Sequence, residues 1–345
     1  MQRTTIMLVF GGESSEHSVS ISSARNVFAA LDNTKYEVVL AYIDATGKWW
    51  LMESLSDSID VTDGLQLLPM LGEGGFTTSA DDQRIMPDVI LPILHGNNGE
   101  DGTVQGLARL LHIPIVGCGV ASSAVCMDKI LTKQLLEHGG IMTVPYETHA
   151  IGEARPSFGF LQERLGGVLF VKPARSGSSV GVSRVENDEE LSVALTLAHR
   201  HDNKVLIERA IVARELEIGM LGSGIDLRQS GVGEIHPEGS FYSFESKYDA
   251  SSQSSVTIPA DIPADLSGRI QSIAKKAYGL VDGSGLARID FFLADDGQLY
   301  LNEINTLPGF TNISMYPKLW RHEGLSYSDV IEQLLTMTIK NGIVK

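Results

Sequence analysis

The sequence has few of the features that mark secreted, membrane or thiolate-metal proteins. Its 345 residues include two cysteines, Cys118 and Cys126, whose spacing matches neither a metal site nor a disulfide framework. Such sparse cysteine is typical of the reducing cytosol, so we expect a cytoplasmic protein. No apolar run approaches the roughly 20 residues of a membrane helix. The apolar run "IMLVF" at 6–10 is too short for a signal peptide and leads directly into two glycines.

Positive charge is scarce as well. The chain has 27 lysines and arginines against 43 aspartates and glutamates, which gives a formal net charge of −16. This balance argues against nucleic acid and anionic membranes as partners, because both attract basic surfaces. It is compatible with a small polyanionic ligand, which a local cluster of lysine, arginine and backbone N–H groups can hold. Length and composition otherwise predict a globular enzyme of roughly two or three domains.

The first third of the chain alternates apolar strands with helices, a pattern typical of a parallel α/β sheet. Ser14 or Ser15 is the candidate N-cap of the first helix, and a second helix is predicted over 101–111. The region 53–85 has no clear pattern and receives no assignment. Buried strands are predicted at 6–10, 36–43, 87–94 and 113–117.

The corner after the first strand, "VFGGESSEHSVSISS" at 9–23, combines a strand, two glycines and a helix. Such corners often bind a phosphate group at the helix N-terminus. Here the turn carries Glu13 and Glu16, where a phosphate would need positive charge. The pattern therefore raises the question of which ligand the corner accepts.

From Val125 the pattern becomes that of antiparallel sheets. Asp128 is the candidate N-cap of a helix that ends at Gly139–Gly140. We expect three lobes, 1–124, 125–213 and 214–345, of which the last two pack together around a nucleotide. The further elements are strands at 168–174, 180–185, 204–211, 215–221 and 231–235, a helix at about 188–201, a helix after Pro263 and a hairpin at 286–304.

The hairpin is the most informative segment, and its sequence is "GLARIDFFLADDGQLYLNEIN" at 285–305. A two-residue turn at Asp296–Gly297 would place Asp290 opposite Glu303, and Arg288 opposite Asn305, all on one face of the hairpin. Opposed carboxylates lie about 5 Å apart at Cβ and repel each other. A divalent cation would bind both of them, and all-oxygen ligands suit Mg²⁺ or Mn²⁺. The alternative is a solvated polar face of an edge hairpin, whose other face carries Ile289, Phe291, Asn302 and Ile304.

Candidate phosphate-binding groups precede the hairpin. The segment "VKPARSGSSVG" at 171–181 joins Lys172 to a glycine- and serine-rich loop that can close over phosphates. Lys129 follows the capping Asp128. Glu208 and Glu215 can accept hydrogen bonds from ribose hydroxyls or an adenine amino group. Each feature alone is also compatible with an ordinary surface position.

Several of these segments together resemble the D-alanine–D-alanine ligases, a family of the ATP-grasp superfamily. The resemblance runs from about residue 5 to about residue 320. It implies a three-lobed ATP-grasp fold, in which a parallel α/β N-terminal domain precedes two antiparallel α+β lobes that clasp ATP under a mobile lid at about 237–257. The segments that carry it are "GGESSEHSVS", "LHGNNGEDGTVQG", "MDK", "VKPARSGSSVGVSRV", "FYSFESKY" and "ARIDFFLADDGQLYLNEINTLPGFTNISMYP".

The resemblance also implies an activity. A first D-alanine would be activated by ATP as an acyl phosphate, and the amine of a second D-alanine would attack it. The product, D-alanyl-D-alanine, serves peptidoglycan synthesis. Relatives are commonly homodimers, which the resemblance extends to this chain.

The same resemblance assigns roles to individual residues. Two Mg²⁺ or Mn²⁺ ions would be held by Asp290, Glu303 and Asn305. ATP would be contacted by Lys129, Lys172, Ser178, Ser179, Glu208, Arg209, Ile211 and Glu215. The oxyanion would be stabilised by Arg288 and the N–H of Gly309. The first D-alanine would meet Glu16 and His95, Glu16 would be linked to Ser178 and Tyr248, and the second D-alanine would meet Lys247, Ser314 and Met315.

Other functions stay open at this point. D-serine as the second substrate is the first alternative, and D-lactate is less favoured because Lys247–Tyr248 indicates an amine nucleophile. A non-catalytic ATP-binding module would be expected to lack the metal ligands or Arg288, and all are present. A nicotinamide dehydrogenase would need a G-x-G-x-x-G turn, which "GGESSEH" does not supply.

Overall fold

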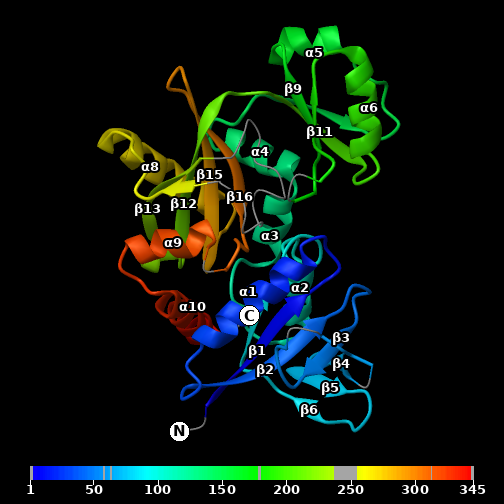
Figure 1. Cartoon of the computed structure of the whole chain (residues 1–345), viewed down its shortest axis with the longest axis vertical. Helices are drawn as coiled ribbons and strands as arrows, with labels where there is room; N and C mark the ends of the chain where they lie inside the picture. The colour runs from blue at the N-terminus through cyan, green and yellow to red at the C-terminus, as the bar shows by residue number, and fades with distance from the viewer. Residues whose placement is uncertain are drawn as a thin grey trace.

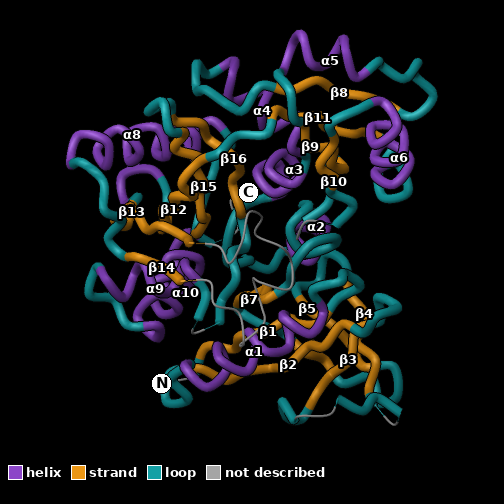
Figure 2. Tube along the Cα trace, turned by 45° about the horizontal axis from the view of Figure 1, so that its top comes forward, coloured by secondary structure: helices purple, strands orange, loops and turns teal. Residues whose placement is uncertain are grey.

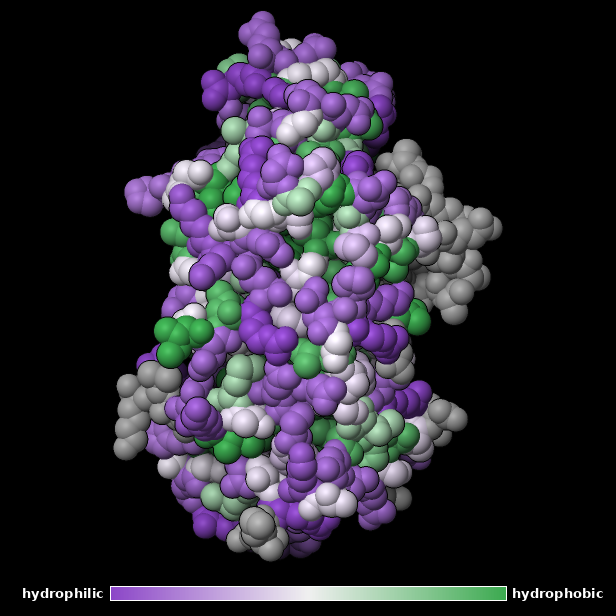
Figure 3. Space-filling model, turned by 90° about the vertical axis from the view of Figure 1, so that its left-hand side faces the viewer, coloured by the Kyte–Doolittle hydropathy of each residue, from purple (hydrophilic) through white to green (hydrophobic). Residues whose placement is uncertain are grey.

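Three β-sheets organise the chain in the computed structural model, which describes residues 3–56, 59–62, 64–177, 180–236, 255–311 and 313–342. Figures 1 and 2 show the three sheets apart from one another, with α3 (Val120–Met127) near the centre. Hydrophilic residues predominate on the face seen in Figure 3, in line with the charge of the chain. Among the described residues, no helix combines the length and apolarity needed to cross a membrane.

The N-terminal sheet has seven strands in the order β6-β5-β4-β3-β2-β1-β7. It is parallel only at its β7 edge, where β1 pairs with β2 and β7, and the strands beyond β2 are antiparallel, so the prediction of a parallel sheet is correct for part of it. Its strands are β1 (Thr4–Gly11), β2 (Tyr36–Ile43), β3 (Trp49–Met52), β4 (Leu65–Met70), β5 (Gly75–Thr78), β6 (Arg84–Ile85) and β7 (Val89–Ile93), and its helices are α1 (His17–Ala30) and α2 (Thr103–Leu111).

Two sequence assignments in this region differ from the structure. The unassigned stretch 53–85 supplies β4, β5 and the two-residue β6, and the mixed exposure of β4 and β5 explains why no alternation was visible in the sequence. The strand predicted at 113–117 is wrong, because only Ile115 makes a bridge, to Ile90 of β7. An apolar run of this length is also compatible with buried loop, and here it meets the β7 edge of the sheet only through that single bridge.

The second sheet has the antiparallel order β10-β9-β11-β8. Its apolar face packs against α5 and α6 around Leu169 and Val205, which are fully buried. The elements are β8 (Tyr146–Ala150), α5 (Phe158–Leu165), β9 (Leu169–Pro173), β10 (Ser183–Val185), α6 (Asp188–Ala198) and β11 (Lys204–Arg209).

The third sheet, β14-β13-β12-β15-β16, is antiparallel and packs against α8. Its core also receives Cys126 of α3 and Leu136 of α4, so these helices pack on the third sheet although they precede the second in the chain. The elements are α4 (Lys129–His138), β12 (Ala213–Leu221), β13 (Arg228–His236), β14 (Ser255–Thr257), α8 (Ala264–Leu280), β15 (Leu286–Ala294), β16 (Leu299–Asn305), α9 (Met315–His322) and α10 (Tyr327–Asn341).

The last helix connects the end of the chain to its beginning. Ile331 and Leu334 of α10 share one apolar core with Val27 of α1 and Leu91 of β7. Figure 1 shows α10 beside α1. Helix α10 begins with a capping box at Ser326, so its start is fixed locally while its buried face belongs to the N-terminal sheet. The third sheet is thereby tied directly to the first.

Candidate functional site

A cleft of about 610 Å³ receives side chains from the second and third sheets and from the loops that follow β1 and β7 of the first. Every predicted site residue that the structure describes lines this cleft. The predicted Ser178, Ser179, Lys247 and Tyr248 lie outside the described residues, as does most of the predicted lid, of which β14 is described. The predicted residues in the cleft wall are Glu16, His95, Lys129, Lys172, Glu208, Arg209, Ile211, Glu215, Arg288, Asp290, Glu303, Asn305, Gly309, Ser314 and Met315.

The β15–β16 hairpin places the predicted metal ligands opposite each other. Asp290 pairs with Glu303 and Arg288 pairs with Asn305, so the predicted register is confirmed at these positions. The two carboxylates and the amide give an all-oxygen set suited to Mg²⁺ or Mn²⁺. Among the described residues, no group of three or more His, Cys, Asp or Glu side chains could hold a metal. Asp290, Glu303 and Asn305 would not fill the octahedral coordination of a Mg²⁺ ion. The remaining positions would be left to phosphate and water, an arrangement that is common for Mg²⁺ in proteins.

The turn that led to this register is nevertheless wrong. The Ala294 N–H donates to the Gln298 carbonyl oxygen (2.9 Å), so the loop comprises 295–297 instead of two residues. That difference shifts the pairing next to the turn by one position, and a β-bulge at Asn302 shifts it back. The two deviations cancel at the predicted ligands. Asn302, predicted on the apolar face, lines the cleft together with Phe291 and Ile304 of that face.

Arg288 is held by two carboxylates in the centre of the cleft. Its Nε and Nη2 donate to the two oxygens of Asp290 (2.8 and 2.7 Å), and Nε lies 2.9 Å from Oε2 of Glu217 on the neighbouring strand β12. Burial disfavours the charge of Arg288, but Asp290 and Glu217 outweigh it and raise its pKa well above the ordinary value. A permanent guanidinium in a half-enclosed cleft is suited to stabilise a developing negative charge.

One end of the cleft contains a buried carboxylate between two lysines. Nζ of Lys133 lies 2.6 Å from Oε1 of Glu208, and Lys172 pairs with the other oxygen. Burial by itself would raise the pKa of Glu208, but Lys172 and Lys133 lower it to about 2. Glu208 is therefore ionised at neutral pH and acts there only as a hydrogen-bond acceptor.

The glycine-rich loop enters the cleft from a fixed base. The Arg175 N–H donates to Oδ2 of Asp202 (2.8 Å), and Nη2 of Arg175 donates to Oδ1 (2.6 Å). Nζ of Lys129 donates to the Ser176 carbonyl oxygen (2.5 Å). The predicted N-cap at the start of this lysine's helix is confirmed, because Oδ1 of Asp128 accepts from the N–H groups of the next turn. Lys129 is thus placed beside the loop by its own helix.

The opposite end of the cleft is acidic. Glu16 and His95 are buried there, and Glu100 accepts the Gly96 N–H (2.7 Å). Burial and the nearby Glu16 raise the pKa of Glu100 to about 8. Burial lowers the pKa of His95, although Glu16 opposes this shift. Nε2 of His95 is buried and makes no hydrogen bond to a described residue.

The first helix begins differently from the prediction. Its N-cap is Glu16, and the helix starts at His17 instead of directly after Ser14 or Ser15. Oγ of Ser14 accepts the N–H of Glu16 (3.2 Å), and the Ser14 carbonyl oxygen accepts that of His17 (3.2 Å), so the serines form a turn before the helix. This extra turn is what carries Glu16 into the cleft.

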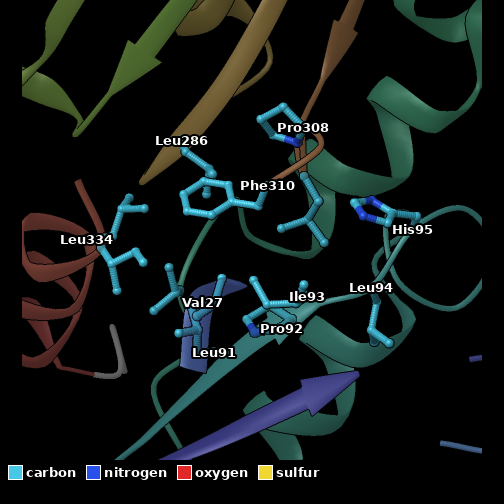
Figure 4. A pocket seen from close by; sticks show the side chains of 13 residues that line it. Val27, Leu91, Pro92, Ile93, Leu94, His95, Leu286, Pro308, Phe310 and Leu334 are labelled. Atoms are coloured by element: carbon cyan, nitrogen blue, oxygen red, sulfur yellow. The ribbon is translucent and has the colours of Figure 1, made fainter. Parts of the chain in front are cut away.

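A second, much smaller cavity lies behind His95. It measures about 20 Å³, enough for roughly one water molecule. Figure 4 shows that the side chains around it, such as Leu91, Ile93, Phe310 and Leu334, are apolar apart from His95 at its edge. It lies in the apolar core between the first and third sheets. Its size and lining exclude it as the place of a polar substrate.

Sequence reasoning missed three charged residues of the site: Glu100, Glu217 and Lys133. A signal existed for Lys133, because it lies three residues from both Ile130 and Leu136 and therefore on the buried face of its helix, where a lysine needs a partner. Glu217 lies two residues after Glu215 and so on the same face of the strand. Its partner Arg288 lies on another strand, so the sequence did not indicate the pair. Glu100 gave no signal beyond its place in a glycine-rich turn.

Comparison with known proteins agrees with this arrangement. Residues 5–118 match the family described as D-ala D-ala ligase N-terminus, and residues 135–336 match the one described as D-ala D-ala ligase C-terminus. A "D-alanine--D-alanine ligase A" of Chromobacterium violaceum is 42% identical over 355 aligned positions, which cover 99% of this chain and 97% of the relative.

Two solved structures have the same fold. The D-alanine-D-alanine ligase of Coxiella burnetii superposes with a TM-score of 0.89 at 34% identity, covering 99% of this chain and 95% of that one. The VanG D-Ala:D-Ser ligase of Enterococcus faecalis gives a TM-score of 0.87 at 33% identity, covering 98% and 100%. The predicted ATP-grasp fold is thereby confirmed.

Proposed function

Because the chain belongs to the D-alanine–D-alanine ligase family, we propose that its cleft is the site at which ATP drives the joining of two D-alanine molecules. The observation that carries this assignment is the convergence of three groups in one cavity. These are the opposed carboxylates Asp290 and Glu303, the cation Arg288, and Lys172 beside Glu208. Together they supply a metal-binding face, an oxyanion partner and a nucleotide wall.

The chemistry requires activation of a carboxylate, since a free carboxylate is a poor electrophile. An oxygen of the first D-alanine attacks the γ-phosphorus of ATP, ADP leaves, and an acyl phosphate results. The amine of the second D-alanine then attacks the acyl carbon, losing a proton, and inorganic phosphate leaves. The negative charge of the tetrahedral state would be stabilised by Arg288 and the N–H of Gly309, both in the cleft wall.

The predicted ligand set would serve two divalent cations. Asp290, Glu303 and Asn305 would hold them, and Mg²⁺ or Mn²⁺ would there neutralise phosphate charge. Lys129, beside the glycine-rich loop, would contact the phosphates along with Lys172. In the structure Lys172 pairs with Glu208, so this role requires its ammonium to move toward the nucleotide. Arg209, Ile211 and Glu215 would line the adenine and ribose, together with Glu208.

The two amino-acid positions follow from charge. Glu16, with His95 beside it, would receive the ammonium of the first D-alanine at the acidic end. Ser314 is the N-cap of α9, so the carboxylate of the second D-alanine would meet that helix N-terminus, next to Met315. Ser178, Ser179, Lys247 and Tyr248 keep the roles that the resemblance implies.

Finer properties are part of this proposal. We expect the chain to act in the cytoplasm, as a homodimer, in peptidoglycan synthesis and without nucleic acid or membrane partners. We also expect three working lobes, 1–124, 125–213 and 214–345. The packing of α3 and α10 across these limits would couple the lobes to one another.

The alternative with a specific observation behind it is D-Ala–D-Ser ligation, because VanG shares the fold at 33% identity. A phosphate-release assay separates the two. Release with D-alanine and ATP alone, with little gain on adding D-serine or D-lactate, is the expected result. Negligible release until D-serine or D-lactate is added would overturn the assignment of the second substrate.

A further inference from the structure

Two lysines share one carboxylate at the nucleotide end, and their surroundings differ. The side chain of Lys172 is 18% exposed and lines the cleft, whereas that of Lys133 is 2% exposed and lies behind the wall. Glu208, between them, is 5% exposed. Lys172 can therefore reach a ligand in the cleft without moving the wall, and Lys133 cannot.

Further contacts fix Lys133 in place. Its Nζ donates to the carbonyl oxygen of Val144 (3.2 Å) and lies 5.3 Å from the centroid of the Tyr146 ring. Both residues belong to the segment around β8, so the ammonium is held between α4 and the second sheet. Burial lowers the pKa of Lys133, and Glu208 opposes that shift.

The proposed function creates a conflict over Lys172. If its ammonium moves to a phosphate group, Glu208 loses one of its two cations while remaining buried. A buried carboxylate left without a partner is strongly unfavourable, so the departure of Lys172 would weaken nucleotide binding unless another cation stayed.

We propose that Lys133 is a positioning residue of the nucleotide site, which holds Glu208 from behind and thereby leaves Lys172 able to move to a phosphate of the nucleotide. The inference rests on the proposed function of the cleft. Lys133 itself does not contact the nucleotide. Glu208 keeps its orientation when Lys172 leaves, because its Oε1 stays paired with Nζ of Lys133.

This role predicts a contrast between ligands with and without phosphate. In Lys133→Met, ADP must compete with Glu208 for the remaining lysine, whereas adenosine makes no demand on Lys172. We expect the dissociation constant of ADP with Mg²⁺ to rise by about 10- to 100-fold, the range for a buried charge that loses its partner. The dissociation constant of adenosine should change by less than about threefold. Isothermal titration calorimetry measures both.

The control is Lys35→Met, which removes a lysine paired with Glu332 of α10, outside the residues that line the cleft. It should leave the ratio of the two affinities unchanged. A second background guards against misfolding: Glu208→Gln removes the charge that Lys133 compensates, so adding Lys133→Met to it should not weaken ADP further.

Equal losses for ADP and adenosine in Lys133→Met, or a further loss of ADP affinity in the double variant, would overturn the inference. So would an unchanged affinity for ADP in the single variant. A wild-type protein that binds neither ADP–Mg²⁺ nor adenosine would instead overturn the proposed nucleotide site itself.

Discussion

Two glutamates at opposite ends of the same cleft have pKa values shifted in opposite directions. Glu208 has two lysine partners and its pKa falls to about 2, whereas Glu100, near Glu16, has its pKa raised to about 8. Burial raises the pKa in both cases, so the difference comes from the neighbouring charges. The lysine end is prepared for an anion such as phosphate, and the acidic end for a cation such as an ammonium.

Two glycine turns that border the cleft make the same point. One follows β1 and leads to Glu16. The other follows β9, lies beside Lys129 and also borders Glu16, since a Cβ at Gly177 would lie 3.6 Å from Oε2 of Glu16. Both have glycines at positive φ, such as Gly11 (+93°) and Gly181 (+72°). The glycines provide backbone conformation, and the charges around them select the ligand. A strand–glycine–helix corner alone therefore does not indicate a phosphate site.

The largest effect on turnover is expected for Glu303→Gln, a substitution between the two ends of the cleft. Replacing a carboxylate by an amide weakens the predicted metal site that serves both substrates, so turnover should fall by more than about 100-fold, equivalent to about 3 kcal/mol. Phosphate release measures this. The fold should persist in a thermal melt, since the change removes one of two facing carboxylates.

The matched control for that variant is Glu234→Gln, a buried carboxylate on the same sheet that pairs with Arg214 outside the cleft. Its turnover should stay within about threefold of wild type, since it touches neither ligand end. Near-normal turnover in Glu303→Gln would refute the metal assignment.

Crossed variants test whether the ends are independent. Glu16→Gln removes the carboxylate for the first ammonium, and KM for D-alanine at that subsite should rise about 10- to 100-fold with KM for ATP nearly unchanged. Lys172→Met should instead raise KM for ATP and leave KM for D-alanine nearly unchanged. Glu13→Gln is the control on the same turn, because exposed Glu13 accepts from Asn98 and its amide form keeps an acceptor oxygen. Parallel changes in both KM values for either variant would contradict the division into two ends.

Replacing the glycine in each of the two turns should reduce stability by different amounts. A Cβ at Gly11 would lie 2.2 Å from the backbone oxygen of Ile43, which cannot move alone, whereas at Gly181 it would lie 2.8 Å from the His201 ring. We expect Gly11→Ala to cost about 3–4 kcal/mol of unfolding free energy and Gly181→Ala about 2 kcal/mol. Gly106→Ala, in open space on α2, should stabilise by up to about 1 kcal/mol. Denaturant titration gives the order, which equal costs at Gly11 and Gly181 would contradict.

The sequence was sufficient for features whose cause is local. The helix start at Asp128 was predicted correctly because the cap and its N–H partners lie within one turn. The facing of Asp290 and Glu303 was also correct, although an unforeseen loop and a bulge at Asn302 had to cancel. Side-chain alternation identifies the faces of a strand, but a bulge depends on the neighbouring strand and leaves no clear pattern.

The sequence did not predict which residues pair with the buried charges, and the reason is different. Glu217 meets Arg288, and Lys133 meets Glu208, only after distant segments have packed together. Spacing along the sequence does not predict such pairs. The charge at each end of the cleft can therefore be read only from the three-dimensional structure. The lone clue was a lysine on an apolar helix face.

The smallest and most specific effect is a proton released when D-alanine binds. At pH 7, below its pKa of about 8, Glu100 is mostly protonated in the empty cleft. An ammonium bound nearby would lower that pKa, so D-alanine should displace up to about one proton at pH 7 and fewer at about pH 8.5, where most of Glu100 is already ionised and free D-alanine is still an ammonium. Calorimetry in two buffers with different ionisation enthalpies measures this number. Glu100→Gln should abolish the release and Glu13→Gln should retain it. Equal binding heats in both buffers at pH 7 would show that the acidic end is not poised for a cation in the way that its charges indicate.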